Sequence, residues 1–490
     1  MKFRTIFLLL GLCGALSGVL HAAVGAPEDQ RPTGYVQDTT VNPFIVTSDG
    51  KDLGDPFPSF WDGVWHLYSM SADAVRVEHL TSTDLVKWVE HKPAMVGKDI
   101  CTASVVRHDH KYYMFYTDGA AQALRVVVSD SPWEFDFSKS QLAAEADGKV
   151  YQKGWFRDVY VTYNENEKLW WMLFEGRCPE VCTGLFKSKD LLQWTQCEPI
   201  FKDKGRQYGS CPQIFKQGKL WYLAIQDCGN WYYSADTPSG PWTNRGQYLS
   251  IIVEAASRFA TDGKRQITWG WLCDWVAKPN VEIKSYGGPM CVGREMVPKA
   301  DGTLGVRPFP ELIAAIRNND SKIDFTSVRK LSGDWKIEDA QRNLQCTGGS
   351  GGVVLLDLPA KNPNCYFQAE LEFGTPGTGA NIVMRSSDTA DRGYAFALAP
   401  ADKKIAIRGF NNPAAGTVLN DKPYAFPGKN KVSLQIFIYN NYMEAFVDGL
   451  ECLSARTVDR SCDKLAIAIT GGPATLRNPF LHYFNNMDAK

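Results

Sequence analysis

The sequence predicts an all-β protein, a five-bladed β-propeller followed by a C-terminal β-sandwich, on three observations. A polar turn that leads into an aromatic strand recurs five times at intervals of about fifty residues, which is typical of four-stranded propeller blades. A different pattern follows, in which glycine, proline and asparagine separate short alternating strands, and this pattern indicates a sandwich. Aromatic residues form 12% of the 490 residues, and aromatic side chains favour β-structure.

The first residues predict an export signal over 1–23. Lys2 and Arg4 precede an almost uncharged run over 6–20, and Ala22 and Ala23 are small residues suited to cleavage. The apolar run is shorter than the about 20 residues that a membrane-spanning helix needs, and polar residues follow it at once. We therefore expect a secreted or periplasmic protein without membrane insertion.

Charge and cysteine content narrow the possible partners. The chain has 53 Lys and Arg against 54 Asp and Glu, so it lacks the basic excess that neutralises a phosphate backbone, and no nucleic-acid partner is expected.

Of 13 cysteines, Cys13 leaves with the signal, and the even number that remains suits a compartment that permits disulfides. The spacing of cysteines and histidines does not predict a zinc site, so we expect no metal ion and no cofactor. The oligomeric state stays open.

The propeller is predicted over 24–318. Its five turn-and-strand copies lie at 62–68, 110–115, 167–172, 218–223 and 263–269. A second motif, Ser-Thr-Asp-Leu at 82–85 before Trp88, returns as Ser-Lys-Asp-Leu at 188–191 before Trp194. A single four-stranded unit cannot bury both of its faces, so neighbouring blades must cover one another. We expect the rings of the aromatic strands to pack between blades: Trp65, Tyr113, Trp171 and Tyr222.

A short helical pattern at 310–317 and the polar run 318–321 mark the end of the propeller, and the sandwich is predicted over 319–490. Asn440 and Asn441 separate two alternating apolar segments, as in a hairpin. The expected strands are 353–358, 366–373, 381–385, 394–398, 404–408, 432–439, 442–447 and 465–469.

The innermost strands of a propeller begin near its axis, so residues at one register on these strands converge on a central cleft. We count back from each aromatic strand to the start of the inner strand before it, and we allow the hairpins to differ in length by one residue. The count gives five equivalent positions: Asp55, Thr102, Asp158, Ser210 and Glu254. A single carboxylate could equally cap a turn or pair with an arginine. Three carboxylates directed at one axis indicate a functional cleft, because crowded like charges are costly.

The same region carries a set of ordered motifs. They are Gly-Asp-Pro at 54–56, Trp-Asp-Gly at 61–63, Phe-Arg-Asp at 156–158, Ser-Cys-Pro-Gln-Ile-Phe at 210–215, Gly-Trp at 270–271 and Gly-Arg-Glu-Met at 293–296. In this order the chain resembles glycoside hydrolase family 32, which includes invertases, inulinases and levanases. The resemblance extends over about 42–483. It implies a propeller with a C-terminal sandwich and retaining hydrolysis of furanosides, with a fructose-containing oligo- or polysaccharide as the carbohydrate substrate.

The resemblance also implies roles for individual residues. Asp55 would attack the anomeric carbon, while Asp158 would hold sugar hydroxyls and stabilise the transition state, with Arg157 supporting the same sugar. Trp61 is a candidate for stacking on a sugar, although a tryptophan in a propeller packs between blades more often. Arg294 is a candidate substrate contact, and a structural ion pair is an equal alternative.

One position departs from the family pattern. The family has a Glu before Cys-Pro that serves as general acid/base, whereas this chain has Ser210, which cannot protonate a leaving oxygen near neutral pH. Retaining hydrolysis needs two carboxyls about 5 to 5.5 Å apart. We expect Glu254 to replace the missing acid, because it shares the inner-strand register one blade further on. Glu175 is the second candidate, because antiparallel pairing returns it toward Asp158.

Two other functions fit the same sequence. The lost glutamate leaves room for a related propeller hydrolase that acts on arabinose or another furanose. It also leaves room for a carbohydrate-binding protein that keeps the cleft without turnover. The residues that we expect to contact the sugar are Arg157, Ser210, Glu175, Trp61 and Arg294.

Overall fold

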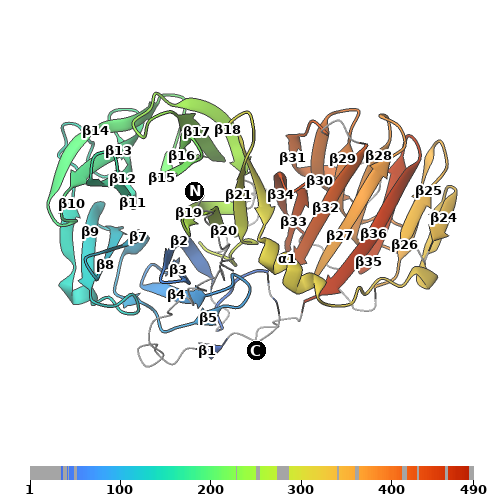
Figure 1. Cartoon of the computed structure of the whole chain (residues 1–490), viewed down its shortest axis with the longest axis horizontal. Helices are drawn as coiled ribbons and strands as arrows, with labels where there is room; N and C mark the ends of the chain where they lie inside the picture. The colour runs from blue at the N-terminus through green and yellow to red at the C-terminus, as the bar shows by residue number, and fades with distance from the viewer. Residues whose placement is uncertain are drawn as a thin grey trace, which may run out of the picture.

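The computed structural model describes residues 35–36, 41, 43–48, 52–227, 229–249, 254–272, 286–338, 342–358, 364–410, 416–426, 430–457 and 462–484. Within them a propeller and a sandwich lie side by side (Figure 1), which confirms the predicted fold class. The predicted export signal, 1–23, lies outside the described residues. In the part of the chain that the structure describes, no helix is long and apolar enough to cross a membrane.

Five antiparallel sheets surround the propeller axis (Figure 1). The first blade contains β2 (Leu53–Trp61), β3 (Val64–Ser71), β4 (Arg76–Ser82) and β5 (Val89–Glu90), and the two-residue strands β1 (Tyr35–Val36) and β6 (Met95–Val96) extend it to six strands instead of the predicted four. The second contains β7 (Ile100–His108), β8 (Lys111–Asp118), β9 (Ala123–Ser129) and β10 (Gln141–Ala144). The third contains β11 (Phe156–Asn164), β12 (Leu169–Arg177), β13 (Val181–Ser188) and β14 (Trp194–Asp203). The fourth contains β15 (Ser210–Gln217), β16 (Leu220–Gln226), β17 (Asn230–Ala235) and β18 (Thr243–Leu249), and the fifth contains β19 (Glu254–Thr261), β20 (Gln266–Leu272), β21 (Arg294–Pro298) and β22 (Leu304–Pro308).

The aromatic repeat forms the second strand of each blade. Its predicted packing rings are buried, as expected: Trp65, Tyr113, Trp171 and Tyr222. Burying rings of this size between sheets supplies much of the apolar area that holds neighbouring blades together.

The second repeated motif forms the same turn twice. Ser82 Oγ accepts a hydrogen bond from the backbone N–H of Leu85 at 2.8 Å, and Ser188 Oγ accepts one from Leu191 at 2.9 Å. Both leucines have positive φ, 62° and 66°, a conformation that the serine hydrogen bond helps to hold. The motif is therefore a structural element of the blades.

Every innermost strand contains a β-bulge near its start. The register shifts between Leu53 and Pro56, Cys101 and Ala103, Arg157 and Tyr160, Ser210 and Gln213, and Ala255 and Arg258. Three bulge residues without the freedom of glycine have positive φ: Asp158 at 62°, Cys211 at 52° and Ala256 at 52°. Bulges turn side chains away from the strand's alternation and are common beside active sites. Here the five bulges lie at one end of the propeller axis.

The helix α1 (Pro310–Arg317) connects the two domains and buries Leu312 and Ile316. Proline suits its first turn, where the backbone N–H has no partner within the helix. Two single-turn 3-10 helices, η2 (Phe137–Lys139) and η3 (Phe325–Ser327), lie in connections.

Two seven-stranded sheets form the sandwich. One contains, in spatial order, β23 (Arg329–Ser332), β26 (Gly351–Leu356), β35 (Lys464–Thr470), β28 (Gly379–Ser386), β29 (Gly393–Ala399), β30 (Lys404–Phe410) and β31 (Thr417–Pro423). The other contains β24 (Trp335–Glu338), β25 (Asn343–Cys346), β36 (Ala474–Tyr483), β27 (Cys365–Phe373), β32 (Lys431–Tyr439), β33 (Tyr442–Val447) and β34 (Glu451–Arg456). Apolar side chains fill the space between the sheets.

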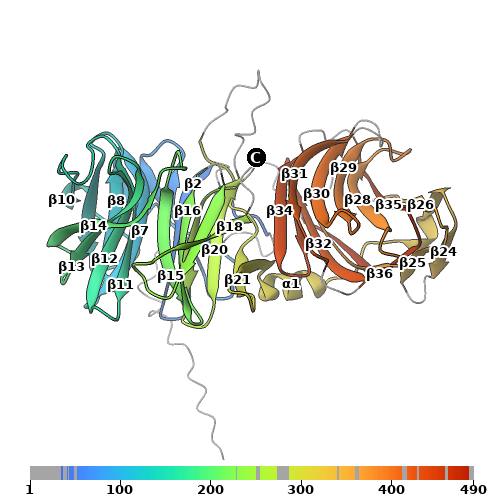
Figure 2. The ribbon, with the colours of Figure 1, turned by 90° about the horizontal axis from the view of Figure 1, so that it is seen from above.

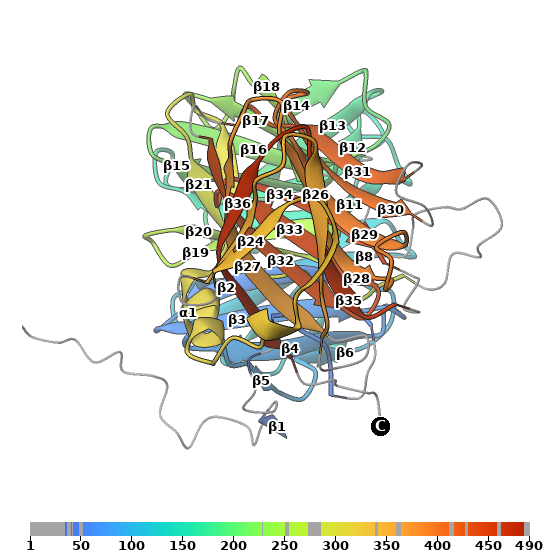
Figure 3. The same ribbon diagram turned by 90° about the vertical axis from the view of Figure 1, so that its right-hand side faces the viewer.

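The two domains share one continuous core. Trp269 and Met290 of the propeller belong to the same buried cluster as Phe437 and Phe446 of the sandwich. The strand β34 lies beside β18 and β22. Figure 2 shows β34 on the side of the sandwich that faces the propeller, and Figure 3 shows the sandwich sheets in front of the blades. A buried apolar interface of this kind fixes the sandwich against the propeller.

Candidate active site

Two carboxylates from different blades meet at the bulged ends of the inner strands. Asp55 on β2 and Asp158 on β11 are both buried, and Thr102 on β7 lies between them. The hydroxyl of Thr102 donates to Oδ2 of Asp55 and lies 3.1 Å from Oδ1 of Asp158. Because a threonine hydroxyl has one hydrogen, a single donor serves both carboxylates. The predicted convergence of Asp55, Thr102 and Asp158 on the axis is therefore present.

The second oxygen of Asp55 has two further donors. Trp271 Nε1 donates to Oδ1 at 3.0 Å, and the hydroxyl of Tyr286 donates to the same oxygen. Trp271 lies in the Gly-Trp motif, to which the sequence assigned no role, and Tyr286 lies in a segment without a repeat signal. Hydrogen bonds to an ionised carboxylate are strong and orient it, so these groups hold Asp55 in one position.

Asp158 is buried as well and has a backbone donor. Its Oδ2 accepts a hydrogen bond from the backbone N–H of Cys211 at 3.0 Å, and its own N–H donates to Thr117 Oγ1 at 2.9 Å. Burial, followed by the negative charge of Glu175, raises the pKa of Asp158 to about 6, and the guanidinium of Arg157 acts in the opposite direction. Asp158 therefore changes charge in the mildly acidic range.

Glu175 lies directly against Ser210, the residue at the position of the family's acid. Its side chain is 0% exposed. Ser210 Oγ donates to Oε2 at 2.8 Å, Arg157 Nε donates to the same oxygen at 2.9 Å, and the backbone N–H of Gly209 donates to Oε1 at 3.0 Å. The ladder pairs Arg157 with Glu175 across β11 and β12. The structure thus joins Glu175, Ser210 and Arg157 in one hydrogen-bonded group beside Asp158.

Glu254, the expected acid, does not join this group and has partners of its own. The side chain is 1% exposed and forms an ion pair with Arg294, while Ser257 Oγ donates to it at 2.8 Å. Arg294 also binds Glu444 on β33 of the sandwich. The predicted substrate contact Arg294 is therefore part of a buried ion-pair group that joins the two domains.

The strand register explains why Glu254 and Ser210 do not occupy equivalent positions. Ser210 is the last paired residue before the bulge of β15, and Ala255 is the last before the bulge of β19. Glu254 thus lies one residue before the position equivalent to Ser210. Since a shift of one residue in a strand reverses the direction of the side chain, Glu254 points away from the face that carries Ser210.

Trp61 also lies elsewhere than expected. It ends β2, six residues after Asp55, which places it about 20 Å along the strand. Its ring contacts Tyr112 edge-on at a centroid distance of 5.2 Å and His66 at 5.0 Å. Trp61 therefore packs between the first two blades, consistent with the packing alternative.

A different tryptophan lies beside Glu175. Trp155 is half-buried, and the guanidinium carbons of Arg157 and Arg177 lie 4.4 Å and 4.7 Å from its ring centroid. Tyr208 stacks on it at 6.0 Å and an angle of 19°. Trp155 thus contacts two cations and a tyrosine ring at the edge of the site.

The site also places three possible metal ligands together. Ligand atoms of Asp55, Asp158 and Cys211 lie within 4.8 Å of one another. Burial raises the pKa of the Cys211 thiol well above its usual value, and the charge of Asp158 adds to this effect. The Cys211 thiol therefore stays protonated beside the two carboxylates as long as it coordinates no cation.

Comparison with known proteins identifies the family. The model of the glycosyl hydrolases family 32 N-terminal domain matches residues 55–308, and the chain belongs to this family of glycoside hydrolases. A fructan 1-exohydrolase of Aegilops tauschii is 28% identical over 552 residues, which cover 96% of this chain and 92% of that protein. A beta-fructofuranosidase, insoluble isoenzyme, of Arabidopsis thaliana is 20% identical, with coverage of 82% and 87%.

Solved structures show the same fold. The Bombyx mori GH32 beta-fructofuranosidase aligns with a TM-score of 0.64 at 14% identity, over 93% of this chain and 94% of that one. The exo-inulinase from Aspergillus awamori aligns with a TM-score of 0.64 at 14% identity, over 89% and 96%.

Proposed function

We propose that the protein is an exported retaining hydrolase that releases fructose from fructose-containing oligo- or polysaccharides. The family membership and the names of relatives aligned over most of their length support fructose as the sugar and fructan as the substrate class. Export rests on the first 23 residues of the sequence, and N-terminal sequencing of protein recovered outside the cell tests it.

In this proposal Asp55 is the nucleophile. Its Oδ1 accepts hydrogen bonds from Trp271 and Tyr286, which hold the carboxylate in the orientation needed to attack the anomeric carbon. A covalent fructosyl-enzyme then forms as the bond to the leaving oxygen breaks. Asp158 stabilises the positive charge that develops on the sugar ring, and its position beside Thr102 supports this role.

The hydrogen bond between Ser210 and Glu175 carries the proposal for the acid. Glu175 is fully buried, whereas Ser210 is half-buried and lies at the position of the family's acid. We infer that Glu175 acts through Ser210. In the first step Glu175 is protonated and the Ser210 hydroxyl turns from Oε2 toward the leaving oxygen. Ser210 gives its hydroxyl proton to that oxygen as the carboxylic proton of Glu175 moves to Ser210 Oγ. In the second step the attacking water returns a proton along the same path, so the protons balance over one turnover.

Substrates that differ in their leaving groups test this assignment. Glu175→Gln should lower kcat/KM for inulin by about 100-fold to 10,000-fold, the range of general acid catalysis. The same variant should keep the first step on an activated aryl β-fructofuranoside, whose leaving group needs no proton, and azide should restore the second step. Glu254→Gln is the matched control, because it removes another buried carboxylate, the partner of Arg294. This control should not combine loss of inulin hydrolysis with azide rescue on the aryl substrate.

A double variant separates the relay from a purely structural role of Glu175. Ser210→Glu combined with Glu175→Gln puts the carboxylate back on the inner strand and keeps a hydrogen-bonding group behind it. We expect this pair to recover inulin hydrolysis relative to Glu175→Gln alone. If Glu254→Gln alone shows loss on inulin with azide rescue on the aryl substrate, the acid is Glu254 and the relay is wrong.

The substrate class has its own test. Reducing sugar should appear from inulin or levan and not from arabinan; release from arabinan alone would favour the related furanose-acting hydrolase. If no glycan is cleaved while inulin still raises the melting temperature, the cleft binds sugar without turnover.

A further inference from the structure

Two cysteines lie at the end of the hairpin that carries Glu175. Cys178 follows β12 and is half-buried, whereas Cys182 is buried in β13. The ladder pairs Arg177 with Val181, so the turn between the two strands consists of the residues 178–180 and begins with Cys178. Cys182 is the second residue after this turn. The short turn therefore holds the two cysteine side chains close to each other.

The thiols of Cys178 and Cys182 are reduced in the structure and contact each other. Burial, followed by a hydrogen bond with the Cys178 thiol, raises the pKa of the Cys182 thiol, and the cations Lys202 and Arg177 act in the opposite direction. Cysteines form a disulfide without movement of the backbone only where their side chains point toward each other. Two thiols that share a hydrogen bond meet this condition.

The third cysteine that the structure describes in this blade lies too far away to compete. Cys197 is on β14 and pairs with Leu185, three residues along β13 from Cys182. Three residues of a strand span about 10 Å, which exceeds the usual Cα separation in a disulfide, about 4.4 to 6.8 Å. The Cys197 thiol instead donates to the carbonyl of Thr195 at 3.6 Å. Within the described part of the third blade, the pair suited to a bond is therefore Cys178 and Cys182.

We propose that Cys178 and Cys182 form a disulfide that closes the end of the β12–β13 hairpin. The sequence predicts an export signal, and disulfides form and persist in the oxidising compartments outside the cytosol. The compartment in which the bond forms rests on the proposed function, because export is part of it. The contact between the thiols does not depend on export.

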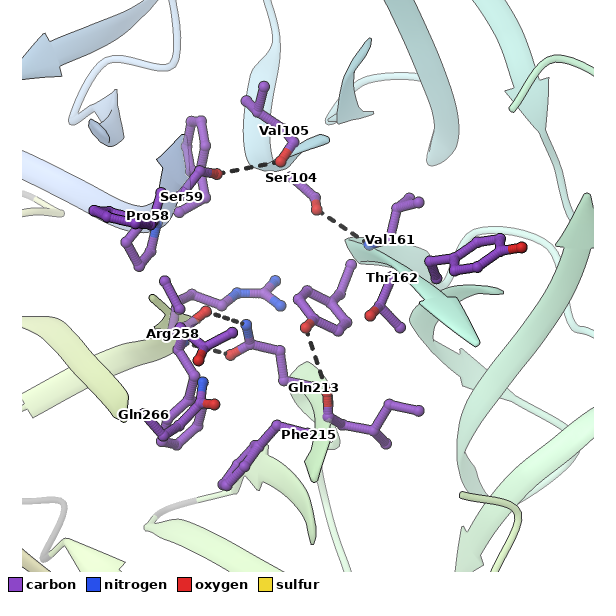
Figure 4. Close-up of a pocket in the computed structure, with 18 of the residues that line it drawn as sticks. Pro58, Ser59, Ser104, Val105, Val161, Thr162, Gln213, Phe215, Arg258 and Gln266 are labelled. Carbon is purple, nitrogen blue, oxygen red and sulfur yellow. Dashed lines mark hydrogen bonds between the residues drawn. The ribbon is translucent and has the colours of Figure 1, made fainter. Parts of the chain in front are cut away.

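The bond would hold a strand end at the edge of the candidate active site. Arg177 lies next to Cys178, and its guanidinium carbon is 4.7 Å from the ring centroid of Trp155. Nearer the propeller axis, hydrogen bonds hold neighbouring strands together, as Figure 4 shows for the N–H of Val161 and Ser104 Oγ at 3.1 Å. A covalent bond at the end of the hairpin would restrain the segment that positions Arg177 in the same way.

The bond can form by exchange with a small-molecule disulfide such as oxidised glutathione. Cys178 reaches solvent, so its thiolate attacks one sulfur of the oxidant, and one reduced glutathione leaves. Cys182 then loses its proton and attacks the sulfur of Cys178, and the second reduced glutathione leaves. The two cysteines together lose two protons and two electrons, which the oxidant takes up as it becomes two molecules of reduced glutathione.

Peptide mapping of the purified full chain tests the bond. The protein is equilibrated in glutathione buffers with a rising oxidised fraction, its free thiols are alkylated, and it is digested with trypsin without reductant. Both cysteines lie in one tryptic peptide, 178–187, which carries two alkyl groups when reduced and lacks two hydrogens when bridged. We expect the bridged peptide to replace the doubly alkylated one as the oxidised fraction rises.

Alkylation of both thiols in the most oxidising buffer, or a bridge from either cysteine to another peptide, would overturn the proposal. The mapping needs neither catalysis nor export, so its failure is distinct from a failure of the proposed function.

Amide hydrogen exchange tests whether the bond closes the hairpin. Exchange over 177–182 should be about tenfold slower in the bridged wild-type chain than after reduction, because the bond restrains local opening. Cys178→Ser and Cys182→Ser should exchange at the faster rate with or without reductant. Cys197→Ser is the matched control and should respond to oxidation as the wild type does. Equal exchange in the bridged and reduced wild-type chain would refute closure of the hairpin, and the wild-type comparison decides the question if a variant fails to fold.

Discussion

Replacing Glu444 by glutamine should weaken the attachment of the sandwich to the propeller. Glu444 is 0% exposed, and its carboxylate binds Arg294, accepts from Ser454 Oγ at 2.8 Å and accepts from the backbone N–H of Val292 at 2.7 Å. Glutamine keeps the size of the side chain but removes the charge that faces Arg294. Breaking a buried ion pair by changing one partner costs about 3 to 5 kcal/mol, and we expect a loss in this range in the free energy of unfolding.

Urea unfolding followed by tryptophan fluorescence measures the loss. Glu451→Gln is the matched control, because Glu451 also joins the domains, through Lys299 at 2.7 Å, but its side chain is 14% exposed. A partly exposed pair of this kind contributes about 1 kcal/mol or less. If Glu444→Gln costs no more than Glu451→Gln, the group around Arg294 does not hold the domains together and the reasoning fails.

Three further predictions concern the site and the buried histidines. Asp55→Asn should reduce turnover by several orders of magnitude with an unchanged circular dichroism spectrum, and wild-type turnover would contradict its role as nucleophile. The pKa of Asp158 is raised to about 6, so kcat/KM should fall as the pH drops below about 6 and Asp158 becomes neutral; a profile flat down to pH 4.5 would exclude an essential Asp158 anion. Burial, followed by the charge of His91, lowers the pKa of His66 to about 3. Because the unfolded chain binds this proton below about 6.5 and the folded chain does not, stability should fall as the pH drops from about 6.5 toward 3. His66→Phe should make this dependence shallower in urea unfolding, and buried His79, whose pKa is also lowered, keeps part of it.

The fold can be predicted from the sequence because each blade repeats the same local sequence patterns. The polar turns and aromatic strands predict the five blades, and the Ser-x-Asp-Leu motif forms the same turn at Leu85 and Leu191. The positions of Asp55 and Asp158 near one another also follow from the repeat, because innermost strands of any propeller begin near the axis.

The difference in register between Glu254 and Ser210 has a specific physical cause. Counting back from a hairpin assumes a regular strand, but each inner strand contains a bulge with unpaired residues, so the count loses its register there. The motifs give the register that the count missed. When the Arg-Asp of Phe-Arg-Asp is aligned with the Ser-Cys of Ser-Cys-Pro, Arg157 is equivalent to Ser210, and Glu254 lies one residue before the equivalent position. The partner Glu444 lies 150 residues beyond Arg294 in another domain, and no local pattern predicts such a contact.

The position of Glu175 follows from a rule that three of the other four blades share. In each blade, one residue of the second strand pairs with the last inner-strand residue before the bulge. In four blades this second-strand residue forms a hydrogen bond to the bulge region of the next blade. Thr117 accepts from the N–H of Asp158, Gln226 accepts from the N–H of Ala256 at 2.8 Å, and Trp271 donates to Asp55. Glu175 occupies the same position in the third blade and binds Gly209 and Ser210.

This rule separates what the fold requires from what the chemistry requires. A link between blades needs only a hydrogen-bonding group, as Thr117 and Gln226 show, so a carboxylate is not necessary for the structural role. A buried carboxylate there carries a cost that threonine or glutamine avoids, and in this blade it is offset by Arg157 and Ser210. The inner strand has Ser210 where the family has its acid. Glu175, on the second strand of the preceding blade, faces Ser210 and holds a carboxylate that can supply the missing proton. Glu175→Gln should therefore keep a hydrogen-bonding group between the blades while it removes the proton and the negative charge that faces Arg157.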